Sequence, residues 1–288
     1  MQVPQNNHRL GLVLVAVAVV AWSTSGLFTR LIAADTPTIL FWRGLFGALG
    51  TAIVLAVIPG ARHPLGSVGL AYAAVTALSM LLFISALRNT SVAHVAVITA
   101  SVPFIAVGLG WVVLREAPGR SALIASLAAL IGVAIMVGFG SDGGVLGDAL
   151  AVLMAIGMAA MIVISRRHDV AALPATCLAS ALCALAVLPF ATLTTVTPQD
   201  LGLLALFALM NQVLGFGLFA LGAKLLPPIQ TALITALEAP LAPLWVWLIL
   251  SETPGQSTLA GGTIVLVAVV GHTMWVTRQV ESEVLPKG

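Results

Sequence analysis

Hydrophobic residues along the chain gather into ten segments, which polar residues, prolines and glycines separate. Each segment is about 20 residues long, the length that an α-helix needs to cross a bilayer. The pattern predicts an all-α membrane protein with ten transmembrane helices, at residues 10–32, 37–58, 67–87, 92–114, 120–139, 146–165, 171–194, 201–222, 228–250 and 258–277.

One stretch of sequence occurs twice, once in each half of the chain. The motif L-x-E-x-P-G-x-S fills residues 114–121 and again residues 250–257, and a tryptophan precedes it by three residues in both places. The repeat predicts two halves, residues 1–141 and 142–288, with five spans each. Because five is odd, the second half enters the bilayer from the opposite side. We therefore expect inverted five-helix repeats, an arrangement typical of transporters whose substrate site lies near the middle of the bilayer.

The composition narrows the class of protein. Hydrophobic residues make up 60% of the chain and charged residues 8%, whereas a soluble domain is about 25% charged. We expect an integral membrane protein with the lipid bilayer as its surroundings and no nucleic-acid partner. With a cytoplasmic N-terminus, nine Lys and Arg residues fall on the cytoplasmic side and two, Arg30 and Arg88, on the other. The positive-inside rule therefore predicts that both termini are cytoplasmic.

Four motifs resemble those of a known family. They are Phe41-Trp42-Arg43, the segment 86–93, Leu114-Arg115-Glu116 and Leu237-Glu238-Ala239-Pro240. Over essentially the whole chain, the sequence resembles the ten-span branch of the drug/metabolite transporter superfamily, built from two EamA domains. Its last motif carries one residue more before proline than the family pattern. Within the family it looks most like bacterial aromatic amino acid exporters. The resemblance implies a multi-pass protein of the bacterial inner membrane, with a central cavity lined by spans 1, 3, 4, 6, 8 and 9.

The ninth segment carries an acid near its middle, Glu238. A carboxylate at that depth costs roughly 3 kcal/mol unless a partner, a proton or water offsets it. In a continuous helix Thr235 and Trp245 share its face, and Pro240 and Pro243 follow it closely. Three interpretations stay open. Glu238 carries a proton that couples transport, it binds a substrate ammonium, or it is a protonated structural acid.

Spans 1 and 3 offer further candidates for the cavity wall. In span 1, Trp22 supplies a stacking surface and Ser25 a hydroxyl. The alternative is that the tryptophan only packs and the hydroxyl bonds to its own helix. In span 3, Ser79 and Phe83 lie on one helical face with Met80 beside them.

Spans 4, 6 and 8 complete the candidate cavity. His94 and Ser101 lie on one face of span 4, although a lone histidine is more often structural. Met158 and Met161 lie on one face of span 6, and methionine suits a permissive apolar site as well as a core. Asn211 lies at mid-depth in span 8, where its amide has to face a partner or a cavity. A substrate carboxylate or ammonium is one such partner.

Arg43, inside the second span, is expected to be structural, either reaching toward the surface or pairing with Asp35. Cys177 and Cys183 show no metal or disulfide spacing. We expect no catalytic residue, metal or cofactor.

The function favoured by the sequence is export of small amphipathic metabolites, above all amino acids with apolar or aromatic side chains, by alternating access. Proton coupling stays open. The alternatives are other metabolites, drug-like cations or a membrane-embedded enzyme. The sequence has no HExxH, no GxSxG and no pair of intramembrane aspartates, which argues against the enzyme.

Overall fold

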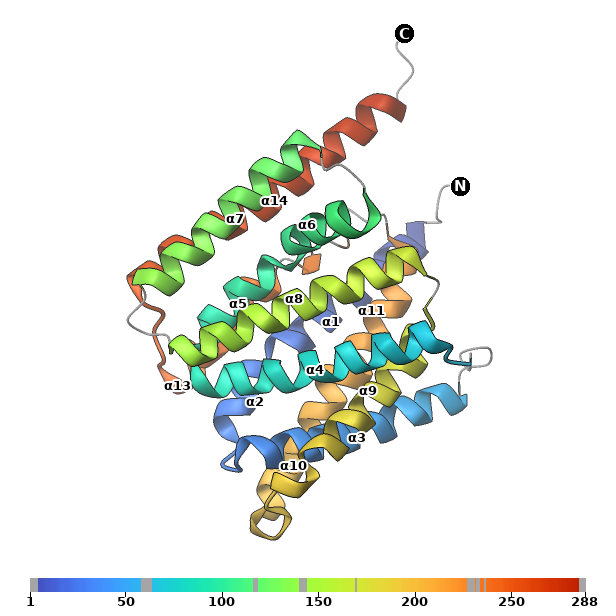
Figure 1. Cartoon of the computed structure of the whole chain (residues 1–288), viewed down its shortest axis with the longest axis vertical. Coiled ribbons are helices and arrows are strands. Elements are labelled where there is room, and N and C mark those ends of the chain that lie inside the picture. The colour runs from blue at the N-terminus through green and yellow to red at the C-terminus, as the bar shows by residue number, and fades with distance from the viewer. Residues whose placement is uncertain are drawn as a thin grey trace.

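The computed structural model describes residues 5–57, 64–115, 119–139, 144–168, 170–226, 231, 234–235 and 237–284. Within these ranges every regular element is helical (Figure 1), so the all-α prediction is confirmed. The helices are α1 (Gln5–Ser23), α2 (Ser25–Leu31), α3 (Thr36–Val57), α4 (Ser67–Asn89), α5 (Val92–Ala100), α6 (Val102–Leu114), α7 (Arg120–Phe139), α8 (Val145–Arg167), α9 (Ala172–Val187), α10 (Pro198–Ala208), a π-helical segment (Leu209–Phe216), α11 (Gly217–Gly222), α13 (Glu238–Leu250) and α14 (Gln256–Val284).

Six helical stretches among these residues are long and apolar enough to cross a membrane, and the bent pair α5–α6 counts as a seventh. Three shorter apolar helices, at 120–135, 238–250 and 256–272, lie where the remaining spans are predicted. Helices that cross a bilayer also present apolar side chains to lipid. α7 does so with Ile124 and Leu127, which are 70% and 62% exposed.

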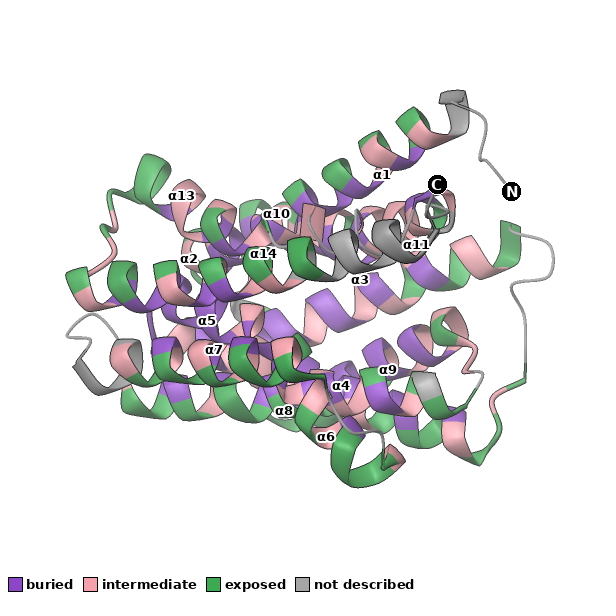
Figure 2. Cartoon of the chain, turned by 90° about the horizontal axis from the view of Figure 1, so that it is seen from above, coloured by how far each residue is buried: buried purple, intermediate pink, exposed green. Residues whose placement is uncertain are grey.

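Successive helices run back and forth through the bundle, and α1 begins at the end where α14 finishes (Figure 1). Buried residues line the inner faces of the helices, and exposed residues cover the outer faces of α7 and α14 (Figure 2). We call the end of the bundle where α2, α4 and α13 finish the acidic end, because it carries Asp35, Asp148, Asp200 and Glu252. The opposite, basic end carries Arg9, Arg115, Arg120 and Arg167.

The internal repeat is visible in the helix boundaries. α6 and α13 are both 13 residues long, and both end at the leucine that opens the repeated motif. The equivalent helices α7 and α14 both begin one position before the serine that closes the motif, and they pack against each other. The same sequence therefore builds the same helical unit twice.

The two copies point in opposite directions. The start of α5 and the end of α13 lie together, since Ser91, Val92 and Ala93 share a pocket with Val246 and Glu252. α5–α6 leads away from that pocket, whereas the equivalent α13 leads toward it. The repeats are therefore inverted, as the odd number of spans predicts.

The predicted continuous ninth helix is wrong around Glu238. α13 begins at Glu238, after a turn in which the Leu237 amide donates to the Ile234 carbonyl at 3.1 Å. Pro240 and Pro243 cannot donate to carbonyls one turn earlier, so the chain starts a new helix there. Glu238 consequently lies in the first turn of a half-helix. Part of this span lies outside the described residues.

Candidate functional site

The joint between α1 and α2 shapes the first wall of the site. Thr24 interrupts the helix, while the hydroxyls of Ser23 and Ser25 donate to the carbonyls of Val20 (2.8 Å) and Trp22 (2.6 Å). Such side-chain bonds to the preceding turn compete with the helix and bend it. The break at Thr24 lies where α1 packs against the π-helical segment.

Asn211 is the hub of the site. Its side-chain oxygen accepts from Arg43 Nη2 at 2.8 Å, its amide nitrogen donates to Ser25 Oγ, and its backbone carbonyl accepts from Trp22 Nε1 at 2.9 Å. Asn211 is 5% exposed and lies in the π-helical segment, a wide turn that often marks functional positions. This one residue therefore joins α1, α2, α3 and the π-helical segment through polar contacts.

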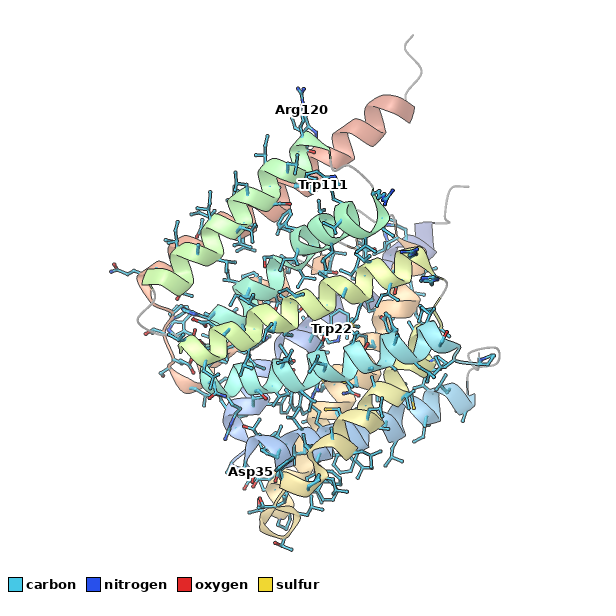
Figure 3. All side chains as sticks on the ribbon, in the orientation of Figure 1. Trp22, Asp35, Trp111 and Arg120 are labelled. Carbon is cyan, nitrogen blue, oxygen red and sulfur yellow. The ribbon has the colours of Figure 1, made fainter. Side chains whose placement is uncertain are left out.

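An aromatic wall lies next to this hub. The centre of the Trp22 ring lies 5.2 Å from the centre of the Phe216 ring and 5.1 Å from that of the Phe219 ring. A Cβ at Gly215 would collide with the Trp22 indole, so only glycine allows the ring to approach this closely. Trp22 lies in the middle of the bundle, between Asp35 toward one end and Arg120 toward the other (Figure 3).

The ninth span adds a second tryptophan and the acid. Trp245 Nε1 donates to Ser23 Oγ at 2.8 Å, so this face of α13 looks toward the α1–α2 joint. Glu238 precedes Trp245 by seven residues and therefore lies on the same face. Glu238 is half-buried, and no hydrogen bond to its carboxylate is found among the described residues. Thr235 donates to the Thr231 carbonyl and lies before the helix start.

His94 is in a different place from the hub. It is completely buried at the acidic end, with Nδ1 2.9 Å from Asp148 Oδ1 and Nε2 3.0 Å from Thr258 Oγ1. Asp148 also accepts from the Thr90 hydroxyl at 2.7 Å. The histidine thus joins α5 of the first half to α8 and α14 of the second. Asp148 and Thr258 were not among the residues predicted from the sequence.

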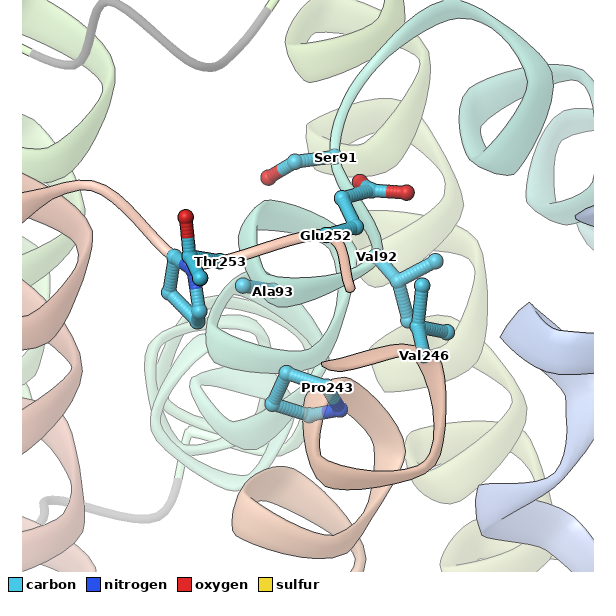
Figure 4. A pocket seen from close by; sticks show the side chains of 8 residues that line it. Ser91, Val92, Ala93, Pro243, Val246, Glu252 and Thr253 are labelled. Atoms are coloured by element: carbon cyan, nitrogen blue, oxygen red, sulfur yellow. The ribbon is translucent and has the colours of Figure 1, made fainter. Parts of the chain in front are cut away.

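An ion pair between Arg30 and Glu252 also joins the two halves at the acidic end. Arg30 Nε lies 3.2 Å from Glu252 Oε2, and its Nη2 donates to the Thr90 carbonyl at 2.8 Å. A pocket of about 70 Å³ lies beside this pair, between the start of α5 and the end of α13 (Figure 4). This pocket is at the end of the bundle and not at mid-depth.

The remaining predicted cavity residues do not contact the hub through any hydrogen bond or ring contact within the described ranges. Ser79 donates to the Val75 carbonyl and lies against Gly157, and Ser101 donates to the Ile98 carbonyl at the break between α5 and α6. Four apolar candidates pack in or against the main core, namely Met80, Phe83, Met158 and Met161.

The pairing of Arg43 with Asp35 is wrong. Asp35 instead accepts from the Thr38 amide at 2.7 Å and the Thr192 hydroxyl at 2.6 Å. Desolvation opposes ionisation of Asp35, but these hydrogen bonds and the charge of Arg88 outweigh it and lower the pKa of its carboxyl. Arg43 turns inward to Asn211. In the part of the chain that the structure describes, no group of three His, Cys, Asp or Glu side chains forms a metal site.

Comparison with known proteins identifies the repeat. The model of the EamA-like transporter family matches the chain twice, at residues 9–138 and 145–274. A solved structure described as "Crystal structure of protein" is similar to this chain, with a TM-score of 0.64 and 19% identity over 93% of this chain and 98% of that one. At this identity the likeness shows the fold alone. No curated protein matches the sequence.

Proposed function

Because the chain belongs to the EamA-like transporter family, we propose that it exports small amphipathic metabolites, above all amino acids with apolar or aromatic side chains. Membership makes it a membrane transporter of the drug/metabolite transporter superfamily. The observation that carries the finer proposal is the aromatic wall of Trp22, Phe216 and Phe219 beside the polar hub at Asn211. An amino acid needs both kinds of surface.

The chemistry of the two surfaces fits the two parts of such a solute. Aromatic rings pack face to edge or offset on other rings and on apolar side chains, which suits phenylalanine or leucine. The hydroxyl of Ser25 and the amide of Asn211 lie next to this wall and suit the charged end. Since a carrier must also release its solute, a few such contacts are sufficient.

Transport would follow by alternating access, with the two inverted halves (residues 1–141 and 142–288) rocking against each other. Two contacts between the halves support this at the acidic end: Arg30 with Glu252, and His94 with Asp148. Both have to break for that end to open toward a central cavity.

The orientation we propose places the basic end and both termini in the cytoplasm, in the inner membrane of a bacterium. The arginines described at that end include Arg9, Arg115, Arg120 and Arg167, whereas Arg30 and Arg88 lie at the acidic end. This distribution follows the positive-inside rule.

Counterflow in proteoliposomes tests the function. Vesicles loaded with unlabelled phenylalanine should accumulate labelled phenylalanine, and leucine should compete while glutamate should not. Trp22→Ala should lower the rate. Trp111→Ala should leave it unchanged, because the Trp111 side chain is 54% exposed on the outside of the bundle. If no apolar amino acid exchanges, the proposal is wrong.

Glu238 favours a second candidate, a carrier of drug-like cations. Its carboxylate is on the face of α13 that also carries Trp245 and has no hydrogen-bond partner among the described residues, and an anionic side chain there suits an ammonium group. Counterflow of tetraphenylphosphonium or ethidium in the same vesicles, without exchange of amino acids, would select this candidate.

A further inference from the structure

Arg43 is a buried cation without an anionic partner among the described residues. Its side chain is 3% exposed, its Nη2 donates to Asn211 at 2.8 Å, and its guanidinium carbon lies 5.0 Å from the centre of the Phe207 ring. Within the same ranges, the ion pairs involve Arg30 and His94 and leave Arg43 without an aspartate or glutamate. Charged groups inside a membrane protein usually pair with one another or serve a substrate pathway.

Two donors in this region have no acceptor. Arg43 Nε and Gln212 Nε2 are both buried, and neither has a hydrogen-bond partner among the described groups. Gln212 is 2% exposed, and its side-chain oxygen already accepts from Ser180 Oγ at 2.8 Å. A buried donor without an acceptor loses its hydration without compensation. Native structures rarely keep such groups without a reason.

The two donors lie on the same side of α3. Gln212 follows Asn211 in the π-helical segment, and a Cβ on Gly47 would collide with the Gln212 amide. Gly47 is four residues after Arg43, so the two positions share one face of α3. α9 packs closely against α3 next to Arg43, because a Cβ on Gly44 would lie 2.8 Å from the Ser180 carbonyl oxygen. The Arg43 guanidinium contacts Asn211 and the Gln212 amide contacts Ser180, so both groups lie in the region bounded by α3, α9 and the π-helical segment.

We propose that Arg43 and Gln212 bind the carboxylate of the transported solute. The inference rests on the proposed function and names the residues that recognise the anionic end. An arginine fork matches the two oxygens of a carboxylate, and hydrogen bonds between ionised groups are shorter and stronger than neutral ones. A solute carboxylate on Arg43 replaces the neutral amide oxygen of Asn211 as acceptor.

The position fits the rest of the site. Asn211 contacts Arg43 through its side chain and Trp22 through its backbone carbonyl. Only Asn211 therefore separates a carboxylate bound at Arg43 from the aromatic wall that would hold the apolar side chain. When the carboxylate displaces Asn211, it also loosens the bond between Asn211 and Ser25 on α2. Binding of the carboxylate therefore changes contacts that join the two halves of the chain, since Arg43 and Ser25 belong to the first half and Asn211 to the second.

A structural role for Arg43 makes a different prediction. If Arg43 only ties α3 to the π-helical segment, its removal weakens the protein without changing which solutes bind. If it binds a carboxylate, its removal weakens the binding of anionic solutes and spares that of cationic ones.

The test compares two probes that share a phenyl group: 3-phenylpropanoate, which has only the carboxylate, and phenethylamine, which has only the ammonium. Their affinities are measured by calorimetry on purified protein in nanodiscs. Wild type should bind 3-phenylpropanoate, and Arg43→Gln should weaken this at least about tenfold, the loss expected for a hydrogen bond to a charged group. Arg120→Gln, on the exposed first residue of α7, should not change it.

Gln212→Glu provides a variant that should fold even if Arg43→Gln does not, because it supplies Arg43 with an internal partner. It should abolish binding of 3-phenylpropanoate without lowering the Tm of the empty protein. The proposal is overturned if wild type does not bind 3-phenylpropanoate, or if either folded variant binds it as tightly as wild type. Phenylalanine counterflow reports separately on the proposed function, since Arg43-dependent binding of 3-phenylpropanoate can persist when no amino acid is exchanged.

Discussion

Arg115 and Ser251 occupy the same unusual backbone conformation at equivalent positions of the two halves. Arg115 has φ 58° and ψ 25°, Ser251 has φ 58° and ψ 21°, and among the described residues they are the two non-glycine positions with positive φ. Each ends an equivalent half-helix, α6 or α13. Their agreement shows that the duplication extends to single dihedral angles. A left-handed residue commonly ends a helix, although glycine is the usual choice there.

Ser251→Gly should therefore stabilise the protein. A side chain in the left-handed region costs roughly 1 kcal/mol relative to glycine, so the substitution should raise the Tm measured in detergent. Arg115→Gly should act in the same direction. Ser251→Val should lower the Tm, since a β-branched residue fits this conformation poorly. A lower Tm for Ser251→Gly would contradict the assigned backbone conformation.

The His94–Asp148 contact should contribute strongly to stability. Removing one member of a buried, hydrogen-bonded pair leaves the other unpaired and costs about 3 kcal/mol or more. His94→Ala and Asp148→Ala should each destabilise the protein, and the double variant should be much less destabilised than the sum of the two. The coupling energy in this cycle should exceed about 0.5 kcal/mol. Additive effects would mean that the two side chains do not interact.

The Arg30–Glu252 pair should control opening of the acidic end more than stability. Its side chains are 25% and 37% exposed, and exposed pairs contribute only about 0.2–1 kcal/mol. Glu252→Gln should leave the Tm nearly unchanged but speed the labelling of a cysteine at Val92, in the adjacent pocket. The reagent is a membrane-impermeant maleimide, and the background replaces Cys177 and Cys183 with alanine. Unchanged labelling would remove the pair from the proposed opening step.

Glu238→Gln distinguishes the interpretations of the intramembrane acid. If Glu238 carries the coupling proton, the glutamine variant should lose flux driven by a pH gradient and keep downhill exchange. If it binds a substrate ammonium, both activities should fall together. Retention of both at the wild-type rate would assign Glu238 a structural role. Vesicles with an imposed pH gradient, compared with counterflow at equal pH, make the measurement.

The Asp35 contacts should make stability depend on pH. Desolvation acts to raise the pKa of Asp35, but hydrogen bonds from Thr192 and Thr38 and the charge of Arg88 outweigh it and hold the pKa below its usual value of 3.8. A lowered pKa in the folded state stabilises the protein above the unfolded pKa, and the stabilisation disappears as pH falls through the folded value. Asp35→Asn should therefore lower the Tm at pH 6, and the difference from wild type should shrink below about pH 4. A difference that does not vary with pH would show that the charge is unimportant.

The spans and the duplication could be predicted because they are local or periodic features of the sequence. Apolar length identifies a crossing helix without knowledge of its neighbours, and the repeat is detected by comparing the chain with itself. The break before Glu238 also had a local signal in Pro240 and Pro243, but a continuous hydrophobic segment concealed it.

The partners of the polar residues could not be predicted, because they lie far away in the sequence. His94 meets Asp148 and Thr258 across 54 and 164 residues, and Arg43 meets Asn211 across 168. Nothing in a helical period indicates which distant side chain will face a given position. For the same reason, pairing with Asp35, which is close in sequence, was one of the two interpretations of Arg43, whereas its observed partner is Asn211.

The opposite directions of α5–α6 and α13 have a mechanical consequence. Two similar halves related by inversion in the membrane give the protein nearly the same shape on its two membrane sides. If the halves rock against each other as proposed, a hinge motion at Ser101 in one part should have a counterpart at Leu237 in the other, and the conformations open to the two sides of the membrane should have similar energies. A carrier that works in this way needs such a balance to cycle, and the doubling of one helical unit would supply it.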